Sequence, residues 1–147
     1  MKRFSLIILF IAFCVLISSC SPASNAPKTP QALQPTAVST ALFQIVKPDG
    51  SKVGMTVDDL KKLPLAQLTI EGKVEEGPKL IDILTAAGVT DFTEVALTGS
   101  SSPVTLTRAQ VDNNTILDFN NHGTMKLATT YVPKPNWTKD ISEITVK

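Results

Sequence analysis

The sequence predicts an α+β domain that is predominantly β and contains one or two short helices. Short apolar stretches recur between turn signals made of Gly, Pro, Asn and Asp, which is typical of a series of short strands. Only the run that follows Pro78 has the apolar spacing of a clear amphipathic helix. No internal repeat or coiled-coil heptad is visible. These observations favour a layered domain of strands with few helices.

The domain is expected to open with a strand and a short helix. Residues 43–46 have the composition of a strand, and Pro48-Asp49-Gly50 is a strong turn signal behind them. Thr56 followed by Asp59 three residues later predicts a helix cap. Pro64 is expected to end this helix.

A second strand and the clearest helix are expected next. Residues 67–70 alternate as a strand does, and Glu71-Gly72 predicts the turn after it. Pro78 suits the first position of a helix, and Gly88 suits a left-handed closing position. One apolar stripe marks the face that packs on a sheet, and it consists of Leu80, Ile83, Leu84 and Ala87.

The rest of the domain is expected to be mostly β. Four further strands are predicted over residues 94–98, 115–119, 124–128 and 141–146. A polar loop over residues 99–103 follows the first of these, and Thr107 is expected to cap a turn of helix through Val111. Asn120-Asn121-His122-Gly123 supplies residues that tolerate positive φ angles, which predicts a tight hairpin.

The N-terminus has the pattern of an export signal. Lys2 and Arg3 precede an almost uniformly apolar run over residues 4–17, which is shorter than the roughly 20 residues that cross a bilayer core. The run ends in Ile17-Ser18-Ser19-Cys20, which resembles the lipobox of bacterial lipoproteins. That resemblance implies cleavage before Cys20 and attachment of a diacylglyceryl group to its thiol. The alternative is an ordinary secretory signal that contains a cysteine.

The chain therefore divides into three expected parts. Residues 1–19 are a lipoprotein signal peptide, residues 20–40 are the lipidated cysteine and a disordered tether, and residues 41–147 are the domain. The tether is rich in Pro, Ser, Ala and Thr and has one charge, Lys28, so it lacks the apolar surface to order itself. Two or more acyl chains hold a protein firmly on a membrane. We expect a lipid-anchored protein of the cell membrane or outer membrane, with its domain outside the cytoplasm.

Charge and cysteine content exclude several kinds of partner. Loss of Lys2 and Arg3 leaves 12 basic residues of the original 14, against 13 acidic residues. No basic excess is available for a nucleic acid, so none is expected as a partner. The only cysteines are Cys14, in the signal, and Cys20. The mature domain thus has no disulfide and no thiolate ligand for a metal.

Several segments occur in an order known from one family. They are Met55-Thr56-Val57-Asp58-Asp59-Leu60, Leu68-Thr69-Ile70-Glu71-Gly72, residues 76–84 with Ala87-Gly88-Val89, Val95-Ala96-Leu97-Thr98-Gly99, Asn121-His122-Gly123-Thr124 and Trp137-Thr138-Lys139-Asp140-Ile141. Their order resembles the molybdopterin-binding domain of sulfite oxidase and its relatives, and it spans nearly the whole domain. The resemblance implies a sulfite oxidase-type molybdopterin-binding-like fold.

The departures from that family concern its metal site. The family holds its metal through the cofactor's dithiolene and one cysteine thiolate, which lies shortly before a Trp-x-Gly-x-x-Leu segment. Here the equivalent stretch, residues 69–77, is shortened, lacks cysteine, and has Glu75 and Glu76 where the tryptophan is expected. A hard carboxylate is a poor substitute for a soft thiolate. We therefore expect no cofactor and no catalytic or metal-binding residues, with molybdopterin as the alternative.

Few residues remain as binding candidates. Arg108, His122 and Trp137 are the candidates for cofactor or ligand contacts. The alternatives are a cap or surface ion pair for Arg108, a solvated turn for His122 and core packing for Trp137. Trp137 and Tyr131 are candidates to line a shallow groove with the loop over residues 99–103.

The two pairs of adjacent acids have a structural interpretation. Asp58-Asp59 and Glu75-Glu76 each precede or open an expected helix, where negative charge meets the positive end of the helix dipole. His122 is the only histidine, so a site that needs two histidines is excluded.

The sequence thus favours a noncatalytic binding or interaction module on a membrane anchor. Its partners are expected to be the membrane, through the lipid on Cys20, and a small molecule or protein of the cell envelope. Two alternatives remain open at this point. One is a molybdopterin-dependent oxidoreductase of the sulfite oxidase type, and the other is a structural lipoprotein of the envelope.

Overall fold

A computed structural model of the protein describes residues 40–147 of the chain. The predictions for the signal peptide, for Cys20 and for the tether up to residue 39 lie outside the described residues. Within residues 40–147, no helix combines the length and the apolar character needed to cross a membrane.

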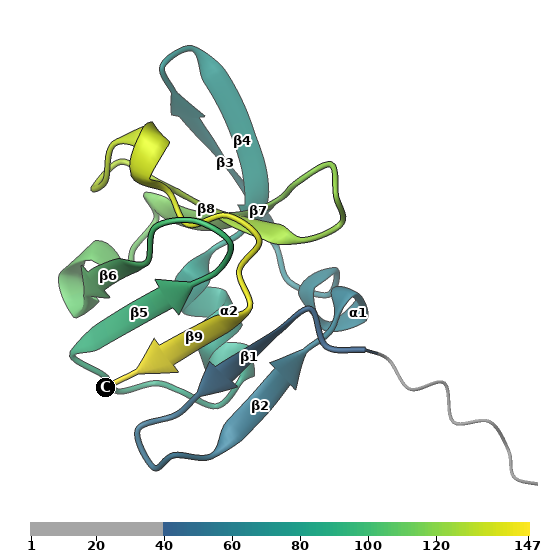
Figure 1. The fold of residues 1–147 in the computed structure, drawn as a ribbon, viewed down its shortest axis with the longest axis vertical. Coiled ribbons are helices and arrows are strands. Elements are labelled where there is room, and N and C mark those ends of the chain that lie inside the picture. Colours follow the sequence, from purple (N-terminus) through teal and green to yellow (C-terminus); the bar gives the residue numbers. More distant parts are fainter. Residues whose placement is uncertain (1–39) are drawn as a thin grey trace, which may run out of the picture. The chain divides into compact units, whose positions relative to one another are not determined.

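The centre of the domain is a five-stranded sheet in the order β2-β1-β9-β5-β6 (Figure 1). Its strands are β1 (Phe43–Val46), β2 (Lys52–Met55), β5 (Glu94–Thr98), β6 (Val104–Thr107) and β9 (Glu143–Val146). β1 and β9 run parallel, although they come from opposite ends of the domain, and the other neighbours are antiparallel. The last strand therefore closes the sheet by inserting between β1 and β5.

Two hairpins lie beside this sheet. One consists of β3 (Leu65–Ile70) and β4 (Lys73–Pro78), and the other of β7 (Thr115–Phe119) and β8 (Met125–Thr129). The two hairpins meet where Gly77 passes Leu117. A Cβ atom on Gly77 would lie 1.9 Å from the Leu117 carbonyl oxygen, so only glycine allows this approach.

The helices are short. They are α1 (Val57–Leu60), α2 (Leu80–Ala86) and the 3-10 turns η1 (Arg108–Gln110) and η2 (Lys134–Asn136). Thr56 and Asp59 form the predicted capping box at α1. At the end of α2, Gly88 has a φ of 78° and donates to the Thr85 carbonyl, while Val89 donates to the Leu84 carbonyl. These bonds satisfy the last carbonyls of the helix.

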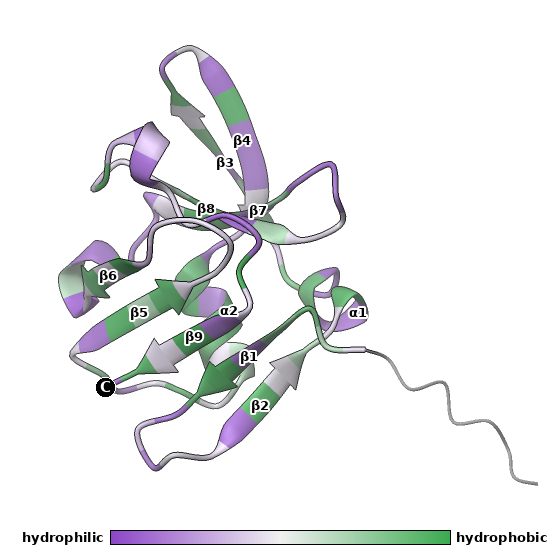
Figure 2. Cartoon of the chain, in the orientation of Figure 1, coloured by the Kyte–Doolittle hydropathy of each residue, from purple (hydrophilic) through white to green (hydrophobic). Residues whose placement is uncertain are grey.

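The core has a large and a small cluster. The large one joins the sheet to the fully buried stripe of α2, which includes Ile83 and Leu84. Figure 2 shows the apolar residues concentrated along β1, β5 and β9. The small cluster holds Ile116, Ala128 and Trp137, and the partly buried Ala66, Leu68, Ile70 and Val132 pack against it. The β3–β4 hairpin therefore covers Trp137 with alternate residues of β3.

The predicted fold class is confirmed, since the domain is mostly β with two short α-helices. Three strands were not predicted, namely β2, β4 and β6. Pro78 does not open a helix as expected but ends β4, and Lys79 is the N-cap of α2. Glu75 and Glu76 consequently lie in a strand rather than before a helix. In the β7–β8 turn only Gly123 has a positive φ, because the turn spans more than two residues.

Candidate functional site

The inner face of the β3–β4 hairpin carries a buried acid. Glu71 and Gly72 both have positive φ, at 50° and 75°, which gives the two-residue turn between Ile70 and Lys73. In this register Leu68 lies opposite Glu75, so both side chains share the face that covers the Trp137 cluster. Glu75 is only 7% exposed. A buried carboxylate requires compensating charge.

Two lysines provide that charge. Lys126 Nζ on β8 donates to Glu75 Oε2 at 2.7 Å, and Lys134 Nζ on η2 donates to Glu75 Oε1 at 2.7 Å. Lys126 also pairs with Asp118 on β7, with 3.0 Å between Nζ and Oδ2. This group of four residues, the Glu75 cluster, links the β3–β4 hairpin to β7, β8 and η2.

The pKa values in the Glu75 cluster follow from these contacts. Hydrogen bonds from Lys126 and then Lys134 lower the pKa of Glu75 from 4.5 to about 2. Burial lowers the pKa of Lys126, but its bonds to Glu75 and Asp118 outweigh burial and raise it. Burial, and then the neighbouring Glu75, raise the pKa of Asp118. At neutral pH, Glu75 is therefore a charged group held between two ammonium groups.

A hollow of about 390 Å³ lies next to the cluster. Its lining consists of Glu71, Lys126, Lys134, Pro135, Trp137 and Lys139. Lys134 Nζ lies 5.2 Å from the centroid of the Trp137 ring, which is a cation–π distance. The indole Nε1 donates to the Val132 carbonyl at 2.9 Å, so the ring is fixed. The hollow thus combines a rigid aromatic wall with three ammonium groups.

The loop over residues 99–103 does not line this hollow, contrary to the groove expected from the sequence. Its polar groups bind the segment that follows Trp137 instead. Ser101 Oγ donates to the Trp137 carbonyl at 3.0 Å and accepts from the Lys139 amide at 2.8 Å. Tyr131 is also absent from the lining, because its hydroxyl donates to Asp112 Oδ2 at 2.7 Å.

Asp140 holds this segment to the β7–β8 turn. Its carboxylate accepts hydrogen bonds from Ser100, Thr124 and Asn120. These bonds lower the pKa of Asp140 to about 2. Asp140 has a φ of 46°, and the bonds compensate for that backbone conformation. The Asp140 carboxylate therefore links the loop over residues 99–103 to the β7–β8 turn.

The other two predicted candidates lie apart from the hollow. Arg108 sits over the Phe92 ring, with 4.9 Å from its guanidinium carbon to the ring centroid. His122 is exposed in the β7–β8 turn, and its backbone amide donates to Asn120 Oδ1. Of the three candidates, Trp137 alone lines the hollow. Sequence reasoning missed Lys126, Lys134 and Glu75 as a group because nothing local connects them.

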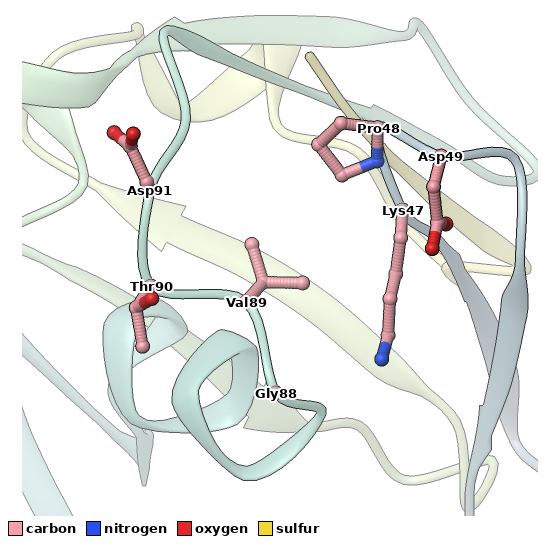
Figure 3. A pocket seen from close by; sticks show the side chains of 7 residues that line it. All are labelled: Lys47, Pro48, Asp49, Gly88, Val89, Thr90 and Asp91. Carbon is pink, nitrogen blue, oxygen red and sulfur yellow. The ribbon is translucent and has the colours of Figure 1, made fainter. Parts of the chain in front are cut away.

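A second hollow, of about 320 Å³, has a structural explanation. Figure 3 shows it between the β1–β2 turn and the end of α2, with the Lys47 side chain extending toward Gly88. Lys47 Nζ lies 3.4 Å from the position of a Cβ on Gly88. A cation at this place complements the negative end of the helix dipole. Hydrogen bonds from Ser51 occupy Asp49 and lower its pKa.

The donor groups do not fit the metal of a molybdopterin cofactor. Residues 41–147 contain no cysteine, and the stretch over residues 69–77 forms a regular hairpin with no thiolate. Glu75, the buried acid of that stretch, is bound by two lysines. Within residues 40–147 no three residues of the types His, Cys, Asp and Glu are grouped as metal ligands would be.

Comparison with known proteins supports the fold. No protein-family model and no curated protein matches the sequence. The crystal structure of the sulfane dehydrogenase SoxCD from Paracoccus pantotrophus matches with a TM-score of 0.51 and 16% sequence identity. The match covers 71% of this chain and 37% of that chain, so the chain spans well under half of its neighbour. The likeness shows a sulfite oxidase-like fold and nothing about activity.

Proposed function

We propose that this chain is a membrane-anchored extracytoplasmic lipoprotein whose sulfite oxidase-like domain is a noncatalytic binding module. The lipobox-like Ile17-Ser18-Ser19-Cys20 behind a short apolar run supports the anchor on Cys20. The fold supports the domain assignment. The membrane and an anionic ligand or protein segment of the cell envelope are its partners.

One observation carries the noncatalytic part of the proposal. The stretch that holds the metal-binding cysteine in the resembled family is replaced by a hairpin whose buried acid, Glu75, is neutralised by Lys126 and Lys134. Binding of a metal to Glu75 would require both ammonium groups to leave a carboxylate that is 7% exposed. A hard oxygen ligand also suits molybdenum of this family poorly. The hairpin is thus built for stability rather than redox chemistry.

The hollow beside Trp137 supports the binding part. Lys139 is exposed, and no ion pair within residues 40–147 involves it. Lys126 and Lys134 each carry spare hydrogens beyond those given to the Glu75 cluster. Such ammonium groups suit carboxylate or phosphate, and the indole suits an apolar part of the same ligand. We therefore assign the site to an anion with an apolar portion.

Trp137 is the only tryptophan, so its fluorescence reports directly on this site. The purified protein is titrated with inorganic phosphate, an aromatic carboxylate and a nucleotide, and the emission of Trp137 is followed. Lys139→Ala should weaken a saturable response about tenfold, whereas replacement of Lys61, an exposed lysine at the C-cap of α1, by Ala should leave it unchanged. An identical response of both variants, or none with any of the three probes, would contradict the anion site.

A further inference from the structure

The β3–β4 hairpin leaves one edge of β3 without a neighbouring strand. β3 pairs with β4 alone, and no other segment of residues 40–147 forms a backbone hydrogen bond with it. β4 lies against β7, at Gly77 and Leu117, so β3 is the outer strand of the hairpin. Figure 1 shows the hairpin extending away from the five-stranded sheet. An open edge of this kind can accept another strand.

The turn identifies the groups that face the open edge. Ile70 and Lys73 flank a two-residue turn, so they form a hydrogen-bonded pair, and such pairs alternate along an antiparallel hairpin. In each intervening pair, the residue on β3 directs its amide and carbonyl away from β4. On β3 these residues are Leu65, Gln67 and Thr69. The pairing of Leu65 with Pro78 agrees with this alternation, because proline has no N–H to give.

The β3 edge lacks the features that protect other edges of this domain. β2 carries Lys52 and is four residues long, and β6 is also only four residues long. β3 has six residues and no charge, proline or glycine among them. Its exposed Leu65 is 57% accessible. Natural proteins normally block such a strand with charge, proline or a bulge, so its exposure points to a partner.

We infer that β3 pairs antiparallel with β3 of a second copy of this chain, in a two-fold arrangement centred on Gln67. This interface goes beyond the proposed ligand site. A register centred on Gln67 places Leu65 opposite the partner's Thr69. Of the possible two-fold registers, this one pairs all three outward residues at once. The symmetry then makes each contact occur twice. β3 contains no charged residue, so no like charges face each other across the two strands.

The side chains favour the same arrangement. Ala66, Leu68 and Ile70 form the inner face of β3 and are only partly buried in one copy. Pairing extends this apolar face across the two-fold axis, so that Ala66 lies opposite the partner's Leu68. On the outer face, Gln67 Nε2 already donates to Glu76 Oε2 at 2.7 Å, so its amide oxygen is available at the axis.

A single pair of six-residue strands is a small interface. Specific stable complexes bury roughly 1,200 Å² or more in total, and one strand pair buries less. The dimer is therefore concentration dependent. Lipid-anchored copies share a surface, which raises their local concentration, so the pairing is tested on the full chain in the cell envelope.

The test uses introduced cysteines and a short bis-maleimide on cells that express the full chain. Gln67→Cys places the two thiols at the axis, where paired Cα atoms are about 5.5 Å apart. Val74→Cys is the matched control, because Val74 is 60% exposed on β4 of the same hairpin but lies about 20 Å from its counterpart, three strand spacings across the sheet and four residues along it. The parent chain controls for Cys14 and Cys20.

The inference predicts several-fold more covalent dimer for Gln67→Cys than for Val74→Cys, and none for the parent. An equal mixture of Leu65→Cys and Thr69→Cys chains with different tags should give a product carrying both tags in more than the twofold excess over either homodimer that random pairing produces. Equal crosslinking of Gln67→Cys and Val74→Cys would overturn the inference, as would a mixed product at or below that twofold excess.

A second measurement tests the pairing without introduced cysteines, in case those variants fold poorly. Sedimentation velocity of the purified full chain in detergent, over rising concentration, should show the parent and Val74→Lys dimerising to the same extent. Gln67→Lys keeps its partner Glu76 but sets two ammonium groups opposite each other, so its dimer should be lost. Equal dimerisation of Gln67→Lys and Val74→Lys would contradict β3 pairing, whether or not the Trp137 hollow binds an anion.

Discussion

Glu75 on β4 and Lys134 on η2 are 59 residues apart in the chain, yet Glu75 Oε1 accepts a hydrogen bond from Lys134 Nζ at 2.7 Å. The same carboxylate accepts from Lys126 at 2.7 Å. Glu75 thus binds the β3–β4 hairpin to the rest of the domain. The proposed noncatalytic role depends on this ion-paired carboxylate.

Replacement of Glu75 by Gln should destabilise the domain by about 3 kcal/mol at neutral pH. The change keeps the side-chain shape but leaves two mostly buried ammonium groups without their shared counter-ion. Glu76→Gln is the matched control, since Glu76 is exposed and bonds only to Gln67; its effect should be within about 0.5 kcal/mol. Urea unfolding followed by Trp137 fluorescence measures both. Equal midpoints for the two variants would contradict the role of Glu75.

Acid should remove the contribution of Glu75. Its pKa is about 2 in the folded protein and ordinarily 4.5, so its stabilisation is complete above pH 4.5 and declines as the pH falls toward 2. Asp118 acts in the opposite direction, because its raised pKa means that protonation favours the folded state. The difference in stability between the parent and Glu75→Gln isolates the Glu75 contribution.

That difference should therefore be constant near neutral pH and shrink from a value on the order of 3 kcal/mol as the pH drops below 4.5. Urea midpoints at a series of pH values provide the measurement. A stability difference that stays constant as the pH falls to about 2 would show that the Glu75 carboxylate is not held by the two lysines.

Gly77→Ala should prevent the β3–β4 hairpin from docking. A Cβ atom at this position would lie 1.9 Å from the Leu117 carbonyl oxygen, and both partners are backbone, so neither strand can yield cheaply. Gly123→Ala is the comparison, since a Cβ there meets nothing within 4 Å and only the positive φ is unfavourable. We expect Gly77→Ala to lose several kcal/mol and Gly123→Ala about 1 kcal/mol, as measured by thermal unfolding.

Cys20→Ser should release the protein from the membrane or leave the precursor uncut. The thiol of Cys20 is the proposed acceptor of the lipid, and serine cannot form the thioether. Phase partition in detergent and metabolic labelling with a fatty acid measure the two effects. Unchanged partition of the variant into the detergent phase would show that another feature holds the chain on the membrane.

Local signals in the sequence were sufficient for several elements. β5 and β7 have the predicted limits, and the Thr56–Asp59 cap and the glycine closure at Gly88 are present as predicted. For the cap and the glycine closure, the deciding hydrogen bonds lie within five residues of the chain. The order of these elements was enough to predict the fold class, which the structure and its neighbour confirm.

Distant interactions explain what the sequence did not reveal. β4 contains two adjacent acids before Pro78, a pattern that favours a helix start, and its strand conformation depends on pairing with β3 and on lysines 51 and 59 residues away. β2 has only four residues and contains Gly54, so its alternation of Val53 and Met55 is too short a signal, and its pairing with β1 defines it. The hollow beside Trp137 likewise gathers residues from the hairpin tip, β8 and η2.

The most direct test of the noncatalytic account is the molybdenum and pterin content of the full chain. The protein is purified from the membranes of a molybdenum-replete culture and assayed by mass spectrometry for the metal and the pterin per chain. The account predicts background amounts of both for the parent and for Glu75→Gln alike, because no thiolate is present in residues 41–147. One molybdenum and one pterin per chain in the parent would contradict it.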